Sequence, residues 1–170
     1  MNAFIEMIVG PWRAASRAAE NSDPLDYDQL LHFDAEELAE GGIAQAYERL
    51  KPMLRMFTAS PLKEVHEYTD ADGSALVESD GKKYEIWRQD SARGDGWLTA
   101  PNAFFSIINA NLLDTEYRLY ALYTGNDLSG IFLTGDQFRA AKAFHAKPLN
   151  RPYIPSLDPP SYGFESSDAG

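Results

Sequence analysis

Two Asp-Gly pairs between short runs of extended character constrain the fold of this chain more than any other feature. Asp72-Gly73 and Asp80-Gly81 separate the runs 62–69, 74–78 and 82–89. Asp-Gly favours tight hairpin turns, because glycine adopts the positive φ angles that such turns require and aspartate tolerates them. The sequence therefore predicts a three-stranded antiparallel meander in the middle of the chain.

A second pair of extended runs lies closer to the carboxyl end. The runs 117–124 and 129–134 are separated by Gly125-Asn126-Asp127, which predicts a further hairpin. In the run 117–124 both alternating faces are apolar, and such a pattern is typical of a central strand that is covered on both sides.

Helical patterns flank both groups of strands. Asp34 and Glu37 have the spacing of a capping box at a helix start, and Gly41-Gly42 predicts an interruption soon afterwards. From Ile43 onward, apolar residues recur at helical spacing as far as Phe57. The other expected helices are an amino-terminal segment over 1–20, a helix capped by Thr99, and a helix from Asp136 to about His145.

The order of these elements is α–α–β–β–β–α–β–β–α. It predicts an α+β fold with a mostly antiparallel sheet of about five strands, a meander plus a hairpin, and helices packed on it. A length of 170 residues suits one domain, which we place at 1–147. The proline-rich residues 148–170 predict an extended tail that is disordered at its end.

Several classes of protein are disfavoured by composition. The chain has no cysteine, which removes disulfide frameworks and thiolate metal sites. Its apolar amino-terminal stretch contains Glu6 and lacks the basic start of a signal peptide. The longest uncharged run, 96–113, holds Pro101 and three asparagines, which makes it a poor membrane helix. We therefore expect a cytoplasmic protein without a membrane partner.

Motifs for catalysis and for cofactor binding are missing from the sequence. The three histidines lack the helical spacing of a metal pair. Asp70-Ala71-Asp72-Gly73 suggests a calcium loop, but Tyr68 and Ser79 would then stand where acidic ligands belong. We predict no catalytic residue, no cofactor and no metal. An alternative stays open, a small hydrolase or transferase that uses carboxylates without a recognisable motif, since any two of the 26 acids can meet in a fold.

The acidic residues are distributed unevenly. The formal net charge is −11, which argues against direct nucleic-acid binding, and residues 21–40 hold seven acids and no lysine or arginine. Such a cluster serves solubility and helix capping, or it forms an electrostatic surface for a basic partner. The candidate partner-binding acids are Asp26, Asp28, Glu36, Glu37, Asp70, Asp72 and Asp80.

Trp87 is the candidate aromatic residue of a binding surface. Alternation along 82–89 places it on the polar face of its strand, with Lys83 and Glu85. Exposed there, it would be a partner anchor, because tryptophan is enriched at interface hot spots. Covered by a helix, it would instead belong to the core.

One part of the chain has a family resemblance. The stretches NAFFSIIN (102–109) and LYALYTGNDLSGIFLT (119–134) resemble small cytosolic immunity proteins that are encoded beside bacterial secreted toxins. The resemblance implies a non-catalytic inhibitor that binds its cognate toxin tightly and covers the toxin's active site. Because no export signal is found, we expect a toxin that acts in the cytosol. A third possibility is an adaptor that uses its proline-rich tail, although this tail lacks a Pro-x-x-Pro core with flanking basic residues.

Overall fold

The structure is a computed structural model that describes residues 22–88, 96–158 and Gly163. The helix predicted over 1–20 and the disorder predicted at the end of the tail lie outside these residues. Within the described ranges, no helix has both the length and the apolar character needed to cross a membrane.

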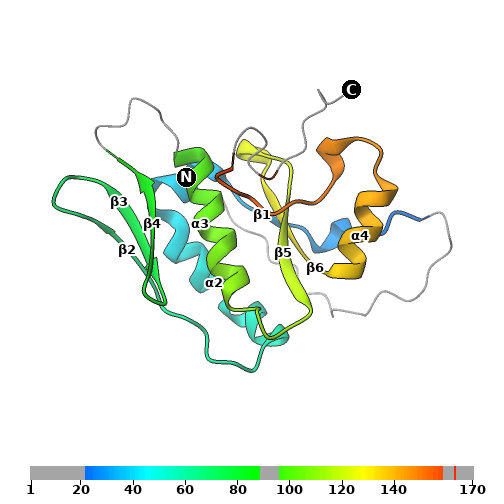
Figure 1. Cartoon of the computed structure of the whole chain (residues 1–170), viewed down its shortest axis with the longest axis horizontal. Coiled ribbons are helices and arrows are strands. Elements are labelled where there is room, and N and C mark those ends of the chain that lie inside the picture. Colours follow the sequence, from blue (N-terminus) through cyan, green and yellow to red (C-terminus); the bar gives the residue numbers. More distant parts are fainter. Residues whose placement is uncertain (1–21, 89–95, 159–162, 164–170) are drawn as a thin grey trace.

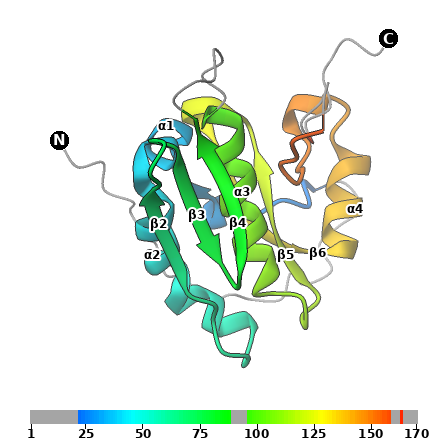
Figure 2. The same cartoon turned by 60° about the vertical axis from the view of Figure 1, so that its left-hand side comes forward.

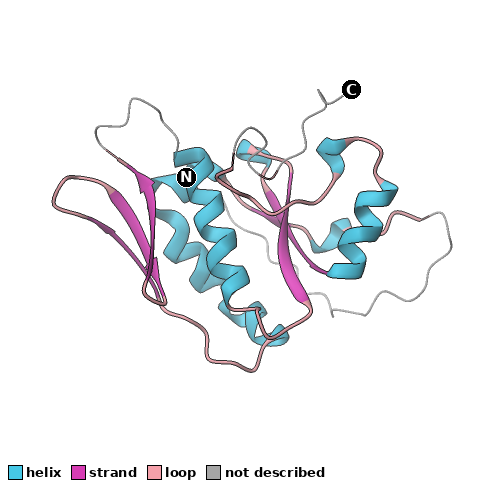
Figure 3. Cartoon of the chain, in the orientation of Figure 1, coloured by secondary structure: helices cyan, strands magenta, loops and turns pink. Residues whose placement is uncertain are grey.

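Four layers follow one another across the molecule, as Figures 1 and 3 show. The sheet made of the strands between residues 65 and 87, named sheet B, forms the first layer, and helices α2 (Ile43–Phe57) and α3 (Gly96–Ala110) form the second. The other sheet, named sheet A, contains the strands at 31–32, 117–122 and 129–134 and forms the third layer. Helix α4 (Gly135–Phe144) covers its far side. The predicted α+β class is confirmed. The strands are divided between two three-stranded antiparallel sheets, however, and do not form one sheet of about five strands.

Sheet B is the meander that the two Asp-Gly pairs predict. Its strand order is β2-β3-β4, with the bounds Val65–Thr69, Ala75–Ser79 and Lys82–Trp87. Asp80 and Gly81 form the turn between β3 and β4 with φ angles of 53° and 75°, as a tight hairpin requires. Figure 2 looks onto the face of sheet B that no described helix covers; α2 and α3 lie behind the sheet.

Sheet A has the strand order β1-β6-β5, with the bounds Leu31–His32, Ser129–Thr134 and Tyr117–Leu122. β1 was not predicted, because a strand of two residues is too short to show a period. The expectation that 117–124 forms a central strand is wrong: β6 is central and β5 pairs with it on one side only. β5 is nevertheless buried on both faces, because sheet A lies between two layers of helices.

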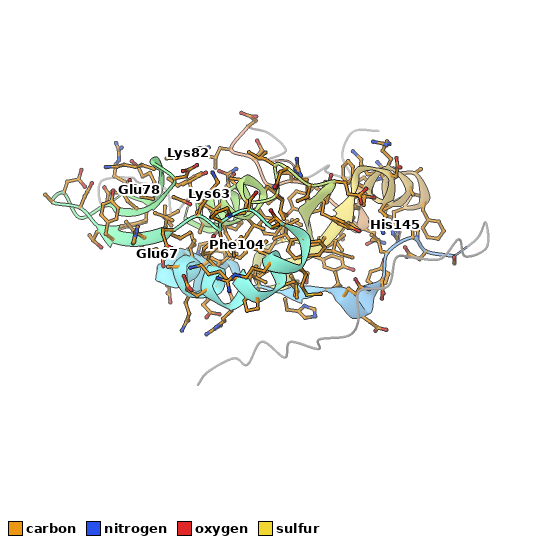
Figure 4. All side chains as sticks on the ribbon, turned by 90° about the horizontal axis from the view of Figure 1, so that it is seen from below. Lys63, Glu67, Glu78, Lys82, Phe104 and His145 are labelled. Carbon is orange, nitrogen blue, oxygen red and sulfur yellow. The ribbon has the colours of Figure 1, made fainter. Side chains whose placement is uncertain are left out.

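Two apolar clusters lie on the two faces of sheet A. The larger one joins sheet B, α2, α3 and the inner face of sheet A, with Phe104 near the middle of the molecule (Figure 4). The smaller one lies between sheet A and α4, where the rings of Tyr120 and Phe138 stack with centroids 4.3 Å apart. Leu25 belongs to this second cluster, so the chain before β1 packs on the α4 side of the molecule.

The first helices follow the predicted pattern. Asp34 caps α1 (Ala35–Glu37) by accepting the N–H groups of Glu36 and Glu37. A single π-type turn, η2 (Leu38–Gly42), then connects α1 to α2, and Gly41 within it has a φ angle of 97°. The predicted interruption at Gly41-Gly42 is thereby confirmed.

Two helices begin at other residues than predicted, and one contact of the tail was not predicted. α3 begins at Gly96 and not after Thr99, whose hydroxyl donates to the Ile86 carbonyl at 2.6 Å. Thr134 is the N-cap of α4 and forms a capping box with Gln137. In the tail, Tyr153 forms an antiparallel bridge with Ala121, so this part of the tail lies along β5.

Candidate functional site

An open groove of about 380 Å³ lies at the end of sheet B where η2 approaches the β2–β3 turn. Ala39, Glu40 and Gly41 form one wall, and the ends of the three strands form the other. The lining residues that carry a charge or a large ring are Glu40, Glu67, Tyr68 and Trp87. The groove therefore combines apolar walls with carboxylates.

Two exposed tryptophans belong to this part of the molecule: Trp87 lines the groove, and Trp97 lies in a helical turn that starts beside it. Trp87 ends β4 and lines the groove with 42% of its surface exposed, so its side chain does not belong to the core. Trp97, in the first turn of α3, is 52% exposed. The preceding residue, Gly96, packs so closely that a Cβ there would lie 3.4 Å from the Cβ of Ala39 and 3.6 Å from the Ile86 carbonyl oxygen. Ala39 and Ile86 both line the groove, so the first turn of α3, which carries Trp97, lies beside it, although Trp97 is not one of the lining residues.

Glu67 fixes the position of the groove relative to α2. Its side chain lies on the face of β2 that is turned toward this helix (Figure 4). Its two carboxylate oxygens accept the N–H groups of Ile43 and Ala44, at 3.1 Å and 2.8 Å. These are donors at the amino terminus of α2 that have no partner within the helix, and the helix dipole favours a negative charge there.

Further carboxylates lie near the same end of the sheet. Glu36 and Glu37 are exposed on α1, which Figure 2 shows beside the end of β2, and Glu40 is exposed on η2. Glu37 lies 3.9 Å from the guanidinium of Arg49. These three exposed glutamates therefore add negative charge to the groove end of sheet B.

Asp70 and Asp72 are held in the β2–β3 turn. Asp70 accepts the N–H groups of Asp72 and Ser74, and Asp72 also accepts from Ser74. Hydrogen bonding with the Asp70 side chain, followed by bonds from Ser74, lowers the pKa of Asp72 to about 2. Both acids therefore have a structural role in the turn, and Asp72 keeps its charge well into the acid range.

The predicted partner-binding residues do not form one surface. Glu36, Glu37, Asp70, Asp72 and Trp87 lie at the groove end of sheet B. Asp80 lies in the turn at the opposite end of the meander, where it pairs with Lys63. Asp26 and Asp28 lie on the 3₁₀ turn η1 (Tyr27–Gln29), on the α4 side of the molecule. Asp26 caps this turn.

The histidines lie apart in the structure, as their spacing suggests. His145 is buried and its Nε2 lies 3.1 Å from Asp23 Oδ1, which links the end of α4 to the chain before β1. His32 is exposed, with Nδ1 3.1 Å from the hydroxyl of Ser129, whereas Ser129 itself is 1% exposed and is closed to a substrate. His66 is exposed on β2.

No cluster of three or more potential metal ligands occurs among the residues that the structure describes. Among the carboxylates that the structure describes, Asp72 and Asp114 have shifted pKa values. The pKa of Asp114 is lowered, mainly by a hydrogen bond from Ser60. A carboxyl that acts as a general acid needs the opposite shift, a raised pKa.

Sequence reasoning missed Glu40, Glu67 and Trp97 as members of this site. For Glu67 the sequence did contain a signal: it lies two residues after Val65 and therefore on the same, apolar face of the strand. A carboxylate on the covered face of a strand needs a partner inside the protein.

Comparison with protein-family models, with curated proteins and with solved structures found no match to this chain.

Proposed function

We propose that this protein is an immunity protein that binds a basic bacterial toxin and neutralises it by covering the toxin's active site. The contact surface in this proposal is the groove end of sheet B, with Trp87 and Trp97 as anchors. The observation that carries the proposal is the exposure of Trp87, by 42%, in a groove that also contains carboxylates. Trp97, which is 52% exposed in the helical turn beside the groove, supports it.

The physical argument concerns the cost of leaving tryptophan in water. Tryptophan has the largest apolar ring of the side chains, so burying it in a partner removes a large apolar area from water. Hot spots of protein interfaces are enriched in tryptophan. Carboxylates around such an anchor favour a partner of opposite charge and disfavour nucleic acid. The surface thus suits a basic protein. Within this proposal the protein acts in the cytoplasm, where the toxin acts.

The test is binding to the protein encoded by the neighbouring gene, together with its activity. We expect co-expression of this chain to abolish the growth defect that the neighbouring gene causes, and we expect the purified proteins to form a complex by calorimetry. Trp87→Ala should weaken the complex at least about tenfold, as expected for a hot spot. Failure of the neighbouring protein to bind, or binding without loss of its toxicity, would contradict the proposal.

A matched control separates anchoring from a general loss of apolar surface. Leu113 is 70% exposed and follows the carboxyl end of α3, and about 20 Å of helix separates Trp97 from Ala110 at that end. Leu113→Ala should therefore leave the dissociation constant within about twofold of the wild-type value, since an exposed residue outside the contact contributes little. Equal effects of Trp87→Ala and Leu113→Ala would place the contact elsewhere.

A further inference from the structure

Within the residues that the structure describes, the outer edge of β2 has unpaired backbone groups. At the end of the β2–β3 hairpin, the Asp70 N–H donates to the Ser74 carbonyl at 3.0 Å. Hydrogen-bonded pairs alternate along an antiparallel ladder, so the backbone groups of His66 and Tyr68 point toward β3. Those of Val65, Glu67 and Thr69 point away from it. Within the described part of the chain, no residue donates to or accepts from these outward groups.

The two edges of sheet A are protected. β1 has only two residues, and very short edge strands give little room for pairing. On β5, the Asn109 side-chain amide donates to the Leu119 carbonyl and accepts its N–H, at 3.0 Å and 2.7 Å. The next outward residue, Ala121, exchanges two backbone hydrogen bonds with Tyr153. Sheet A is thus closed to a further strand.

The other edge of sheet B is protected by different means. β4 begins with Lys82 and Lys83, and charged residues on an edge strand disfavour pairing. The register between β3 and β4 shifts at Ala75/Leu76, as in a β-bulge. The Ile86 carbonyl is occupied by the Thr99 hydroxyl at 2.6 Å. β2 has five residues, and it has no lysine, no proline and no register shift.

Charge indicates what kind of strand fits this edge. Glu64, Glu67 and Asp70 succeed one another along β2 and its flanks, and Glu40 lines the groove on the inner side. Lys51 Nζ lies 4.0 Å from Glu64, and Lys83 on β4 interacts electrostatically with Asp70. A second copy of this chain would place two such acidic rows side by side, and like charges opposite one another destabilise a strand pair. A basic strand would gain from the same row.

The geometry points to strand addition: an extended, basic segment of a partner protein pairs with the outer edge of β2 as a fourth strand of sheet B. Its backbone bonds to the N–H and C=O groups of Val65, Glu67 and Thr69. Its inward side chains enter the groove between Glu40 and Glu67. This inference rests on the proposed function for the class of partner, and it adds the mode of binding.

A peptide probe tests the pairing without the toxin. The probe is an eight-residue peptide of alternating threonine and lysine with blocked termini, titrated into the full chain and followed by NMR. We expect shifted and more slowly exchanging amide protons at Val65, Glu67 and Thr69, and smaller changes at His66 and Tyr68. A fully N-methylated copy has the same charge but no backbone donor. It should bind about three- to tenfold more weakly for each hydrogen bond lost.

Two variants at one position complete the test. Thr69→Pro removes an outward N–H and leaves the ladder to β3 intact, since proline is tolerated at such edge positions. It should weaken the peptide at least about threefold, whereas Thr69→Ala keeps the N–H and should bind as the wild type does. Equal binding of the N-methylated peptide, or no change at the three amides, overturns strand addition. If the toxin is nevertheless bound, the proposed function stands; if the peptide pairs with β2 but the toxin is not bound, the proposed function alone fails.

Discussion

At the scale of single residues, Tyr47 connects burial to a measurable pH dependence. Its ring is fully buried in the core, and its hydroxyl donates to the Lys63 carbonyl at 2.6 Å. Burial raises the pKa of Tyr47 to about 12 from the ordinary tyrosine value of 10.0. The native state therefore holds this proton more tightly than the unfolded chain does. The stabilisation is complete below pH 10 and is lost as the pH rises from there through 12.

We expect Tyr47→Phe to lower the free energy of unfolding by about 1 kcal/mol at pH 7, because the Lys63 carbonyl loses its buried donor. Between pH 10 and 12 the wild type should lose stability that the variant does not lose, so the two curves should converge. Urea denaturation at a series of pH values measures this difference. A difference that stays constant up to pH 12 would show that the tyrosine proton is not linked to folding.

At the scale of elements, Glu67 is the contact through which a strand positions a helix. It joins β2 to the first amide groups of α2, and η2, which forms one wall of the groove, lies directly before them. Glu67→Gln should destabilise the fold by about 1 kcal/mol, because the amide offers one oxygen in place of a charged pair of oxygens. Glu78→Gln is the matched control, since Glu78 belongs to the adjacent strand and its carboxylate lies 3.9 Å from Lys83 Nζ. Thermal melts of both variants measure this, and equal shifts in Tm would contradict a capping role.

The elements with a local chemical signal could be predicted from the sequence. The hairpin at Asp80-Gly81 depends on backbone angles that few residues adopt, so its sequence identifies it. β1 has no such signal, because it exists only through its pairing with β6. The apolar faces of β5 correctly predicted that both faces are buried. They could not predict the strand order, because burial of the two faces does not show whether a strand has a neighbour at each edge.

At the scale of the whole molecule, the fold places acids that are close in the sequence on different sides of the protein. Asp26 and Glu36 are ten positions apart, yet Asp26 lies on the α4 side and Glu36 lies at the groove end of sheet B. Asp70 lies in the turn before β3, and Asp80 lies in the turn after it, at the opposite end of the strand. A charge count along the chain cannot show this division, because it depends on how the layers stack. The groove end draws its acids from α1, η2, β2 and a turn.

This division predicts how the proposed complex depends on salt. Glu36, Glu40 and Asp70 lie together at the groove end, where they would accelerate the approach of a basic partner. The triple variant Glu36→Gln, Glu40→Gln, Asp70→Asn should slow association about tenfold at low ionic strength. The effect should shrink near 0.15 M salt, where the Debye length is about 8 Å.

The matched control neutralises three exposed acids elsewhere, Asp28→Asn, Glu116→Gln and Asp136→Asn. Both triple variants change the net charge of −11 by the same amount, so a difference between them reports position and not total charge. Stopped-flow association with the neighbouring gene's product, measured over a series of salt concentrations, compares them. The control should associate within about twofold of the wild-type rate, because charges beyond a Debye length of the contact are screened. If both variants slowed association equally at every salt concentration, the acids at the groove end would contribute only to the overall charge of the protein.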